Sequence, residues 1–417
     1  TGKWFSTTIG DAEYDENATL MERIVDSRSI ELDSPKHELA MIQFESNLHA
    51  IIDKYQKQGI PVFVGSVASN LKDHPPFIDI PDGNQRSALE AYNEAKAVYE
   101  TRDYESALKL FTAARDLDGL KFRAPTGINN IIQSTTEQNE NAFYVPVEEN
   151  MKSFIEDGII GFELMLEHLH PNQQGYFLIG KSYAESLLDY YQIDVSTLPQ
   201  DLDDYFDEMR LTEIDHKVAE HRVRILKQGF PFILGEKPNP YQLTYRTTSK
   251  ADSLAFRIVN SNLNWDEGKV ELAGYYELEG EKDKAIKEYL SLARNQPWND
   301  SPYVFAARVY LDRNDFANAE PLLRTAYDIN PNDAFITKML GAIEVQKGNA
   351  QEGIRLLEIS RSINPGDSQM LYNLSGAYGI DRQFEKALEI ALIVRRQNPR
   401  FPGNEAWIQQ LENILNR

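Results

Sequence analysis

Asn-Asp-Phe-Ala-Asn-Ala-Glu-Pro-Leu-Leu-Arg-Thr-Ala-Tyr-Asp-Ile-Asn-Pro, residues 314–331, is the stretch that decides the fold of the C-terminal third. Its last residue belongs to a series of prolines spaced 34 residues apart: Pro297, Pro331, Pro365 and Pro399. Asparagine precedes three of them, and Gln296 precedes the first. A fixed period of this length predicts one helical hairpin per repeat, with proline closing each second helix because proline cannot continue it.

Small residues recur inside each period at the places where two helices cross closely. They are Ala273 and Ala285, Ala307, Ala319 and Ala326, Gly341 and Gly353, and Ser375 and Ala387 in the four successive repeats. Aromatic residues recur as Tyr276, Tyr310 and Tyr378, and Glu344 interrupts that column. The pattern predicts a stack of four helical hairpins over residues 266–417.

This pattern resembles the tetratricopeptide repeat (TPR) family. The resemblance implies an all-α superhelix whose concave face binds a peptide or a partner protein. A single further match lies at 84–118, where two helix-length runs from Ala88 to Asp118 flank Arg102-Asp103-Tyr104. We therefore expect one inserted TPR-like hairpin in the N-terminal half.

The residues around that insert have a different pattern. Met41, Phe44, Leu48, Ile51 and Tyr55 recur every three to four residues and predict an amphipathic helix. The apolar runs 60–64 and 142–145 suit strands buried on both faces of a parallel sheet. An apolar-periodic stretch from 176 to 191 predicts another helix. Helices alternating with buried strands indicate α/β architecture, here a partial doubly wound domain of two or three strands.

The whole chain is therefore expected to be helix-rich, with an α/β region followed by an all-α TPR superhelix. Residues 1–195 form the partial α/β region, 196–265 a helical or irregular connector, and 266–417 the four repeats. Within the connector, Thr212 followed by Asp215 predicts the start of a helix that runs to about Gln228.

Composition limits the possible partners. The net charge of −22 over 417 residues, without a basic cluster, argues against nucleic-acid binding. No apolar run is long enough to span a membrane. The absence of cysteine excludes disulfides and thiolate metal sites. The acidic peak at 201–208 is interpreted as a solvated surface, with a cation or basic-partner site as the alternative. Because the chain begins at Thr1, we expect it to be processed or a fragment.

The stretch Glu167-His168-Leu169-His170-Pro171-Asn172, followed by Gly175, combines groups suited to acid–base chemistry with turn-forming residues. A carboxylate three residues before a histidine can hold one imidazole nitrogen and leave the other free to accept a proton. The alternative is that both histidines simply lie in a polar turn.

The same stretch resembles the last motif of the SGNH (GDSL-type) hydrolase family, usually Asp-x-x-His-Pro with a glycine shortly after. The runs 60–64 and 142–145 resemble that family's fourth and fifth strands, and 116–125 resembles the junction after the insert in bacterial members fused to TPR repeats. The resemblance implies that His170 is the general base and Glu167, in place of the usual Asp, the carboxylate that orients it.

The family's Gly-Asp-Ser nucleophile motif does not occur in the sequence. The resemblance therefore implies a fragment that is inactive alone. Its parent would be an esterase or acyl-transferring hydrolase acting on an ester-bearing small molecule or glycan. It also implies a bacterial parent, periplasmic or membrane-anchored through a segment outside these residues.

Three other patterns have simpler interpretations. Ser66, after the first predicted strand, is a weak candidate nucleophile. Residues 175–182 match the Walker A spacing, but bulky apolar residues fill the loop positions, so an amphipathic helix is the better interpretation. The remaining histidines lack metal-ligand spacing: His37, His49, His74, His216 and His221. We expect no cofactor and no metal.

Two functions follow from these observations. The first is the C-terminal part of an SGNH-like serine esterase with a TPR protein-binding tail. The second is a non-enzymatic TPR scaffold that binds a peptide or a partner protein, in which the α/β region is structural.

Overall fold

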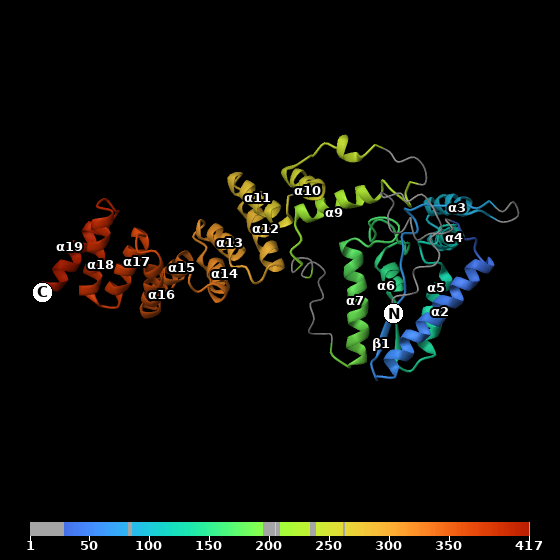
Figure 1. Cartoon of the computed structure of the whole chain (residues 1–417), viewed down its shortest axis with the longest axis horizontal. Helices are drawn as coiled ribbons and strands as arrows, with labels where there is room; N and C mark the ends of the chain where they lie inside the picture. The colour runs from blue at the N-terminus through green and yellow to red at the C-terminus, as the bar shows by residue number, and fades with distance from the viewer. Residues whose placement is uncertain are drawn as a thin grey trace, which may run out of the picture. The chain divides into compact units, whose positions relative to one another are not determined.

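The computed structural model describes residues 29–81, 86–194, 205, 209–233, 239–261 and 263–416. They fall into two compact units, one from 1–198 with 222–244 and the other from 199–221 with 245–417 (Figure 1). Both units are rich in helix, as the sequence predicts. The acidic residues predicted as a peak at 201–208 lie outside the described residues.

The first unit is built around two short parallel strands. Its elements are α2 (Pro35–Gln56), β1 (Val62–Gly65), α3 (Ala88–Glu100), α4 (Tyr104–Leu117), α5 (Thr126–Glu137), β2 (Ala142–Val145), α6 (Val147–Phe154) and α7 (Gln173–Tyr190). In the sheet Val62 pairs with Ala142 and Gly65 with Val145. Helix α7 lies on one side of the strands, and α2 and α5 lie on the other (Figure 1). Helices α2, α3, α4 and α7 and both strands form where the sequence predicts them.

The sheet is smaller and more exposed than the prediction of a doubly wound remnant required. Among the described residues it has two strands of four residues each, in the order β1-β2. Every residue of β1 is partly exposed. The apolar run 60–64 thus does not mark a strand buried on both faces, and the prediction of a doubly wound SGNH remnant gains no support from this sheet.

The predicted insert is a helical hairpin, α3 and α4. Ser87 begins α3 through a capping box with Glu90, and the Asp103 side chain caps α4 by accepting from the Ser106 backbone N–H. Ala95 and Ala107 are fully buried between the two helices.

The second unit contains the predicted stack of paired helices. The first helix of each pair is α11 (Trp265–Leu278), α13 (Ser301–Leu311), α15 (Ala334–Gln346) or α17 (Ser368–Ile380). The second helix is α12 (Lys282–Asn295), α14 (Phe316–Ile329), α16 (Ala350–Ile363) or α18 (Phe384–Gln397), and α19 (Asn404–Leu415) packs after the last. Each helix contacts the next along the chain (Figure 1), so the predicted all-α repeat array is confirmed.

The predicted small residues lie where the paired helices cross. A Cβ at Gly341 would come within 2.7 Å of Leu357 Cγ and 3.1 Å of the Gly353 carbonyl oxygen. In the last pair the Ser375 hydroxyl donates to the Ala387 carbonyl at 2.7 Å. Side chains larger than these would force the two helices apart.

The turn inside each hairpin has one residue in the left-handed region. These residues are Gly280 (φ 79°), Asn314 (φ 57°), Gly348 (φ 87°) and Arg382 (φ 60°), again 34 residues apart, and Arg102 (φ 65°) in the insert. A left-handed residue just after a helix ends it and turns the chain back toward its partner. The hairpins therefore share one turn geometry, although only two of the five residues are glycine.

The connector contacts the repeat array through an ion pair between Asp215 and the buried Lys269. Helix α9 (Glu213–Leu226) begins where predicted, with the Thr212 backbone N–H donating to Asp215 at 2.9 Å. The Lys269 ammonium, fully buried on α11, lies 2.8 Å from Asp215 and 3.0 Å from Glu288. Burial raises the pKa of Glu288, whereas the nearby Lys269 outweighs burial at Asp215 and lowers its pKa. Helix α10 (Lys250–Asn260) packs on α11 beside this network.

The turn geometry makes a prediction that a matched pair of glycines can test. A Cβ would meet no atom within 4 Å at Gly274, inside α11, or at Gly280, in the left-handed turn. Gly280→Ala is expected to lower the free energy of unfolding by about 1–2 kcal/mol, because the added Cβ strains a positive φ. Gly274→Ala is expected to raise it by about 0.5–1 kcal/mol through helix propensity. Urea denaturation measures both, and equal shifts of the same sign would contradict the assignment.

Candidate functional site

The stretch from Glu167 to Asn172 forms a tight loop between two extended segments. Met165 bridges Pro171 in antiparallel fashion, and the Leu166 backbone N–H donates to the His170 carbonyl at 2.8 Å. The Asn172 side chain accepts from the Gly175 backbone N–H at 3.0 Å and so caps α7. The predicted helix start after this turn is confirmed.

Glu167 lies at the centre of the loop and is fully buried. Its carboxylate accepts the backbone N–H groups of His168 at 2.7 Å and His170 at 2.8 Å. The Nδ1 atoms of both imidazoles lie against its two oxygens. Burial alone would raise the pKa of Glu167, but the hydrogen bonds and charges of the two histidines outweigh it and lower the pKa to about 2.

His170 has the local geometry that the sequence predicts. An ionised carboxylate can only accept hydrogen bonds. The Nδ1 atom of His170 therefore carries a hydrogen and donates a hydrogen bond to Glu167. The side chain is 52% exposed, so the neutral ring presents Nε2 as an acceptor outside the loop. The structure thus brings Glu167 and His170 together, and a catalytic role for the pair stays a prediction.

His168 shares the Glu167 carboxylate with His170 and is buried. Its ring packs among other rings at centroid distances of 5.0 to 6.2 Å: Phe77, Phe232, His74 and Phe122. Burial, together with the charges of Arg123 and His168, lowers the pKa of His74 to about 4. The neutral His74 Nδ1–H donates to the Pro75 carbonyl at 2.8 Å. The side chains that cover the loop are up to about 100 residues away in sequence, so its local pattern gave no signal of them.

Ser66 and the Walker-like stretch are accounted for by the fold. The buried Ser66 hydroxyl donates to Glu149 at 3.1 Å and accepts the Glu148 backbone N–H at 2.8 Å, so its recorded partners are not histidines. Residues 175–182 lie within α7, as the helical interpretation predicts. His221 is a packed histidine, buried and 2.9 Å from Asp252.

Among the described residues, no group of three or more His, Cys, Asp or Glu side chains is arranged to hold a metal ion. None of the helices described is both long and apolar enough to cross a membrane.

The repeat array offers a second candidate site, on the side where successive first helices meet. Each first helix carries a row of four residues at spacings of three, four and three, and the rows superpose at the 34-residue period. We call these rows the first-helix face: Glu267, Val270, Gly274 and Glu277; Ser301, Val304, Arg308 and Leu311; Phe335, Lys338, Ala342 and Val345; Gln369, Tyr372, Gly376 and Gly379. None of the sixteen residues is fully buried.

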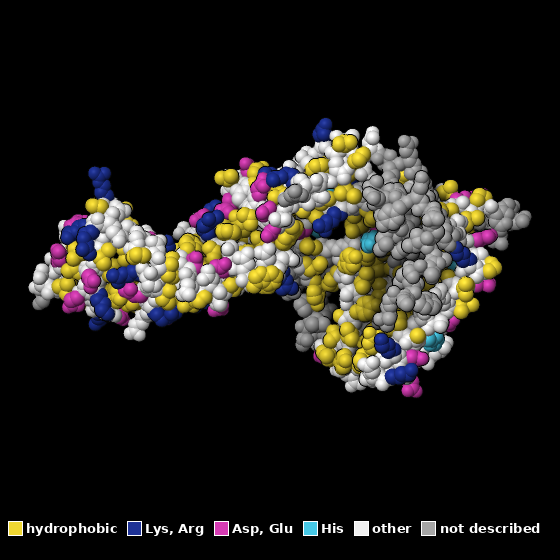
Figure 2. All heavy atoms as spheres, in the orientation of Figure 1, with side chains coloured by type: hydrophobic (Ala, Val, Ile, Leu, Met, Phe, Trp, Pro, Cys, Tyr) yellow, Lys and Arg dark blue, Asp and Glu magenta, His cyan; other side chains and the backbone are white. Residues whose placement is uncertain are grey.

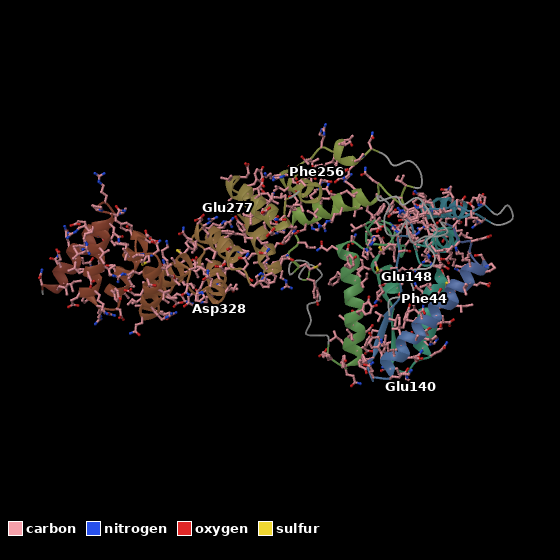
Figure 3. The ribbon with its side chains drawn as sticks, viewed as in Figure 1. Phe44, Glu140, Glu148, Phe256, Glu277 and Asp328 are labelled. Carbon is pink, nitrogen blue, oxygen red and sulfur yellow. The ribbon has the colours of Figure 1, made fainter. Side chains whose placement is uncertain are left out.

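Contacts between successive pairs locate this face. Arg308 on α13 lies 3.5 Å from Glu277 on α11, a residue labelled in Figure 3. Helices α15 and α17 contact each other directly. At the far end, a Cβ on Gly379 would come within 2.6 Å of the Trp407 ring of α19. The first helices therefore line one side of the array.

The first-helix face is apolar and open, with separate charges. A Cβ at Gly274 or Gly376 would meet no atom within 4 Å. Val270 is 37% exposed, and Lys338 lies over the Phe335 ring while pairing with Asp367 at 2.7 Å. Figure 2 shows hydrophobic side chains lying among charged ones along the array. Such a surface has room for another chain to approach the helix backbone.

Comparison with known proteins finds similarity over about a third of the chain. No protein-family model matches the chain. The anaphase-promoting complex subunit CDC16 of Saccharomyces cerevisiae is 26% identical over 130 residues, which are 30% of this chain and 16% of that protein. This chain thus spans about one sixth of that curated relative.

Two solved structures illustrate the structural similarity. The crystal structure of MamA is 18% identical, covers 36% of this chain and 81% of its own, and has a TM-score of 0.34. That of YrrB, described as a TPR protein with an unusual peptide-binding site, is 15% identical over 37% of this chain and 80% of its own, with a TM-score of 0.34.

These findings correct the family resemblance stated above. No family model of a hydrolase matches the chain, and YrrB, one of the similar structures, is described as a TPR protein. The SGNH (GDSL-type) assignment is therefore wrong, and so are the esterase activity and the ester or glycan partners that it implied. The described residues instead define a protein with a TPR-type helical array. The bacterial, exported location stays a prediction.

Glu167 makes the stability of the first unit depend on pH. A carboxylate whose pKa falls from its ordinary 4.5 to about 2 on folding stabilises the fold above pH 4.5, and this contribution is lost as the pH falls toward 2. The shift corresponds to about 2–4 kcal/mol. Glu167→Gln is expected to cost that much at pH 6, and the difference from the parent protein should shrink below pH 4.

Denaturation of both proteins between pH 2 and pH 7 measures this difference. Glu185→Gln, which alters a half-exposed carboxylate on α7, is the matched control and is expected to leave the free energy of unfolding within about 0.5 kcal/mol at each pH. A gap between Glu167→Gln and the parent that does not change with pH would contradict the assigned role of Glu167.

Proposed function

We propose that this chain is a TPR scaffold and that its first-helix face binds an extended peptide or a segment of a partner protein. The observation that carries the proposal is the open surface at Gly274 and Gly376, on a side where neighbouring repeats present half-buried aliphatic and aromatic groups. Apolar surface that stays accessible in a rigid array gains free energy when a partner covers it.

The geometry favours an extended segment over a compact ligand. The same four positions recur once per repeat, so an elongated chain can use equivalent contacts in successive repeats. Charges differ along the face: Glu267 and Glu277 belong to the first repeat, whereas Arg308 and Lys338 belong to the second and third. This gradient would set the direction in which a bound segment runs.

A substitution that fills the face tests the proposal. Gly376→Tyr places a ring where a Cβ meets no protein atom, so the helix is expected to form normally while the ligand's path is blocked. We expect binding of the captured partner to weaken by about tenfold or more, equivalent to about 1.4 kcal/mol. The partner is first captured with the full chain, and isothermal titration calorimetry then measures its affinity.

Ala317→Tyr is the matched control, because it adds the same ring to an exposed position on α14, a second helix. It is expected to leave the affinity unchanged. If the α14 variant weakens binding and the α17 variant does not, the ligand binds to another surface and the proposal fails.

A further inference from the structure

A polar cavity of about 140 Å³ lies in the first unit, beside the ends of the two strands. It is lined by α4, α5, the end of β2 and the start of α6, where Figure 3 labels Glu148. Ser66, the first residue after β1, hydrogen-bonds Glu149 in its wall. In sheets of parallel strands, ligands bind outside the carboxyl ends of the strands. This cavity takes no part in the proposed binding by the repeats.

One wall contains a hydrogen-bond donor, Arg115 Nη1, without an acceptor among the described residues. The Arg115 side chain is 97% buried; its Nε donates to Asp116 at 3.0 Å and its Nη2 to Thr126 at 2.7 Å. Its Nη1 atom forms no hydrogen bond to a described residue, since the nearest carboxylate oxygen, on Glu148, is 3.7 Å away. Arg115 lines the cavity, so a ligand oxygen there would give this N–H a hydrogen-bond acceptor.

The charges of the cavity are arranged in pairs, with one exception. Arg115 pairs with Asp116 at 2.9 Å, and Lys152 pairs with Glu148 at 3.0 Å. Glu149 accepts only from neutral hydroxyls among the described residues, Ser66 at 3.1 Å and Tyr144 at 2.9 Å. The cavity therefore combines ion-paired cationic donors with a carboxylate, Glu149, that pairs with no cation among the described residues.

We propose that this cavity binds a small zwitterion, with a free α-amino acid as the simplest case. The ligand carboxylate accepts from Arg115 Nη1 and from Lys152, and its ammonium group neutralises Glu149. A simple anion would be repelled by Glu149, and a simple cation would leave Nη1 without an acceptor. The volume suits a ligand as small as an amino acid.

Three probes of matched size separate these ligand classes: glycine, acetate and methylammonium. Isothermal titration calorimetry is carried out with the full chain at constant ionic strength. We expect saturable binding of glycine or L-alanine, and no saturable binding of acetate or methylammonium. Acetate binding as tightly as glycine, methylammonium binding as tightly as glycine, or no saturable binding of any probe would each overturn the proposal.

Glu149→Gln tests the assigned contact directly. The amide keeps the same shape and an oxygen for Tyr144 but loses the charge and the acceptor for Ser66. Glycine affinity is therefore expected to fall by about tenfold, with a small fall in the melting temperature without ligand. Glu156→Gln, at an exposed glutamate just beyond α6, is the control and is expected to bind glycine normally. Unchanged affinity in Glu149→Gln would overturn the proposal, and partner binding by the array is expected to be normal in both variants.

Discussion

The close crossing of two helices within each hairpin is the constraint on which the repeat array depends. Two residues twelve apart in sequence must both be small enough for the helices to approach. These pairs are Ala273 and Ala285, Ala307 and Ala319, Gly341 and Gly353, Ser375 and Ala387, and, in the insert, Ala95 and Ala107. All are buried. Because these side chains are small, the two helices of each hairpin approach closely where they cross. A left-handed residue in each turn then directs the second helix back along the first.

This constraint explains why the array could be predicted from the sequence. Small residues, closing prolines and hairpin lengths repeat at one period, so four copies of the same weak signal reinforce one another. The turn conformation was harder to see, because Asn314 and Arg382 occupy positions that Gly280 and Gly348 fill elsewhere. The Lys269 network could not be predicted, since the two carboxylates that surround the ammonium lie 54 and 19 residues away in sequence.

In the loop from Glu167 to Asn172, the sequence predicts a local contact but not the segments that surround it. The contact between Glu167 and His170 was predicted correctly because it is local: three residues and one turn are enough to form it. For the same reason it cannot identify a hydrolase, because such a loop can form without the rest of that family's fold. The sharing of Glu167 with His168, and the aromatic cover from Phe77 and Phe232, depend on distant segments that the motif does not specify.

The central claim is that a partner covers the first-helix face, and hydroxyl-radical footprinting of the full chain, with and without its captured partner, tests it most directly. Radical labelling reports the exposure of individual side chains. We predict that binding lowers the labelling of Val270, Phe335 and Tyr372 and leaves Tyr327, on the second helix α14, unchanged. Protection of Tyr327 with unchanged labelling of the other three would contradict the account.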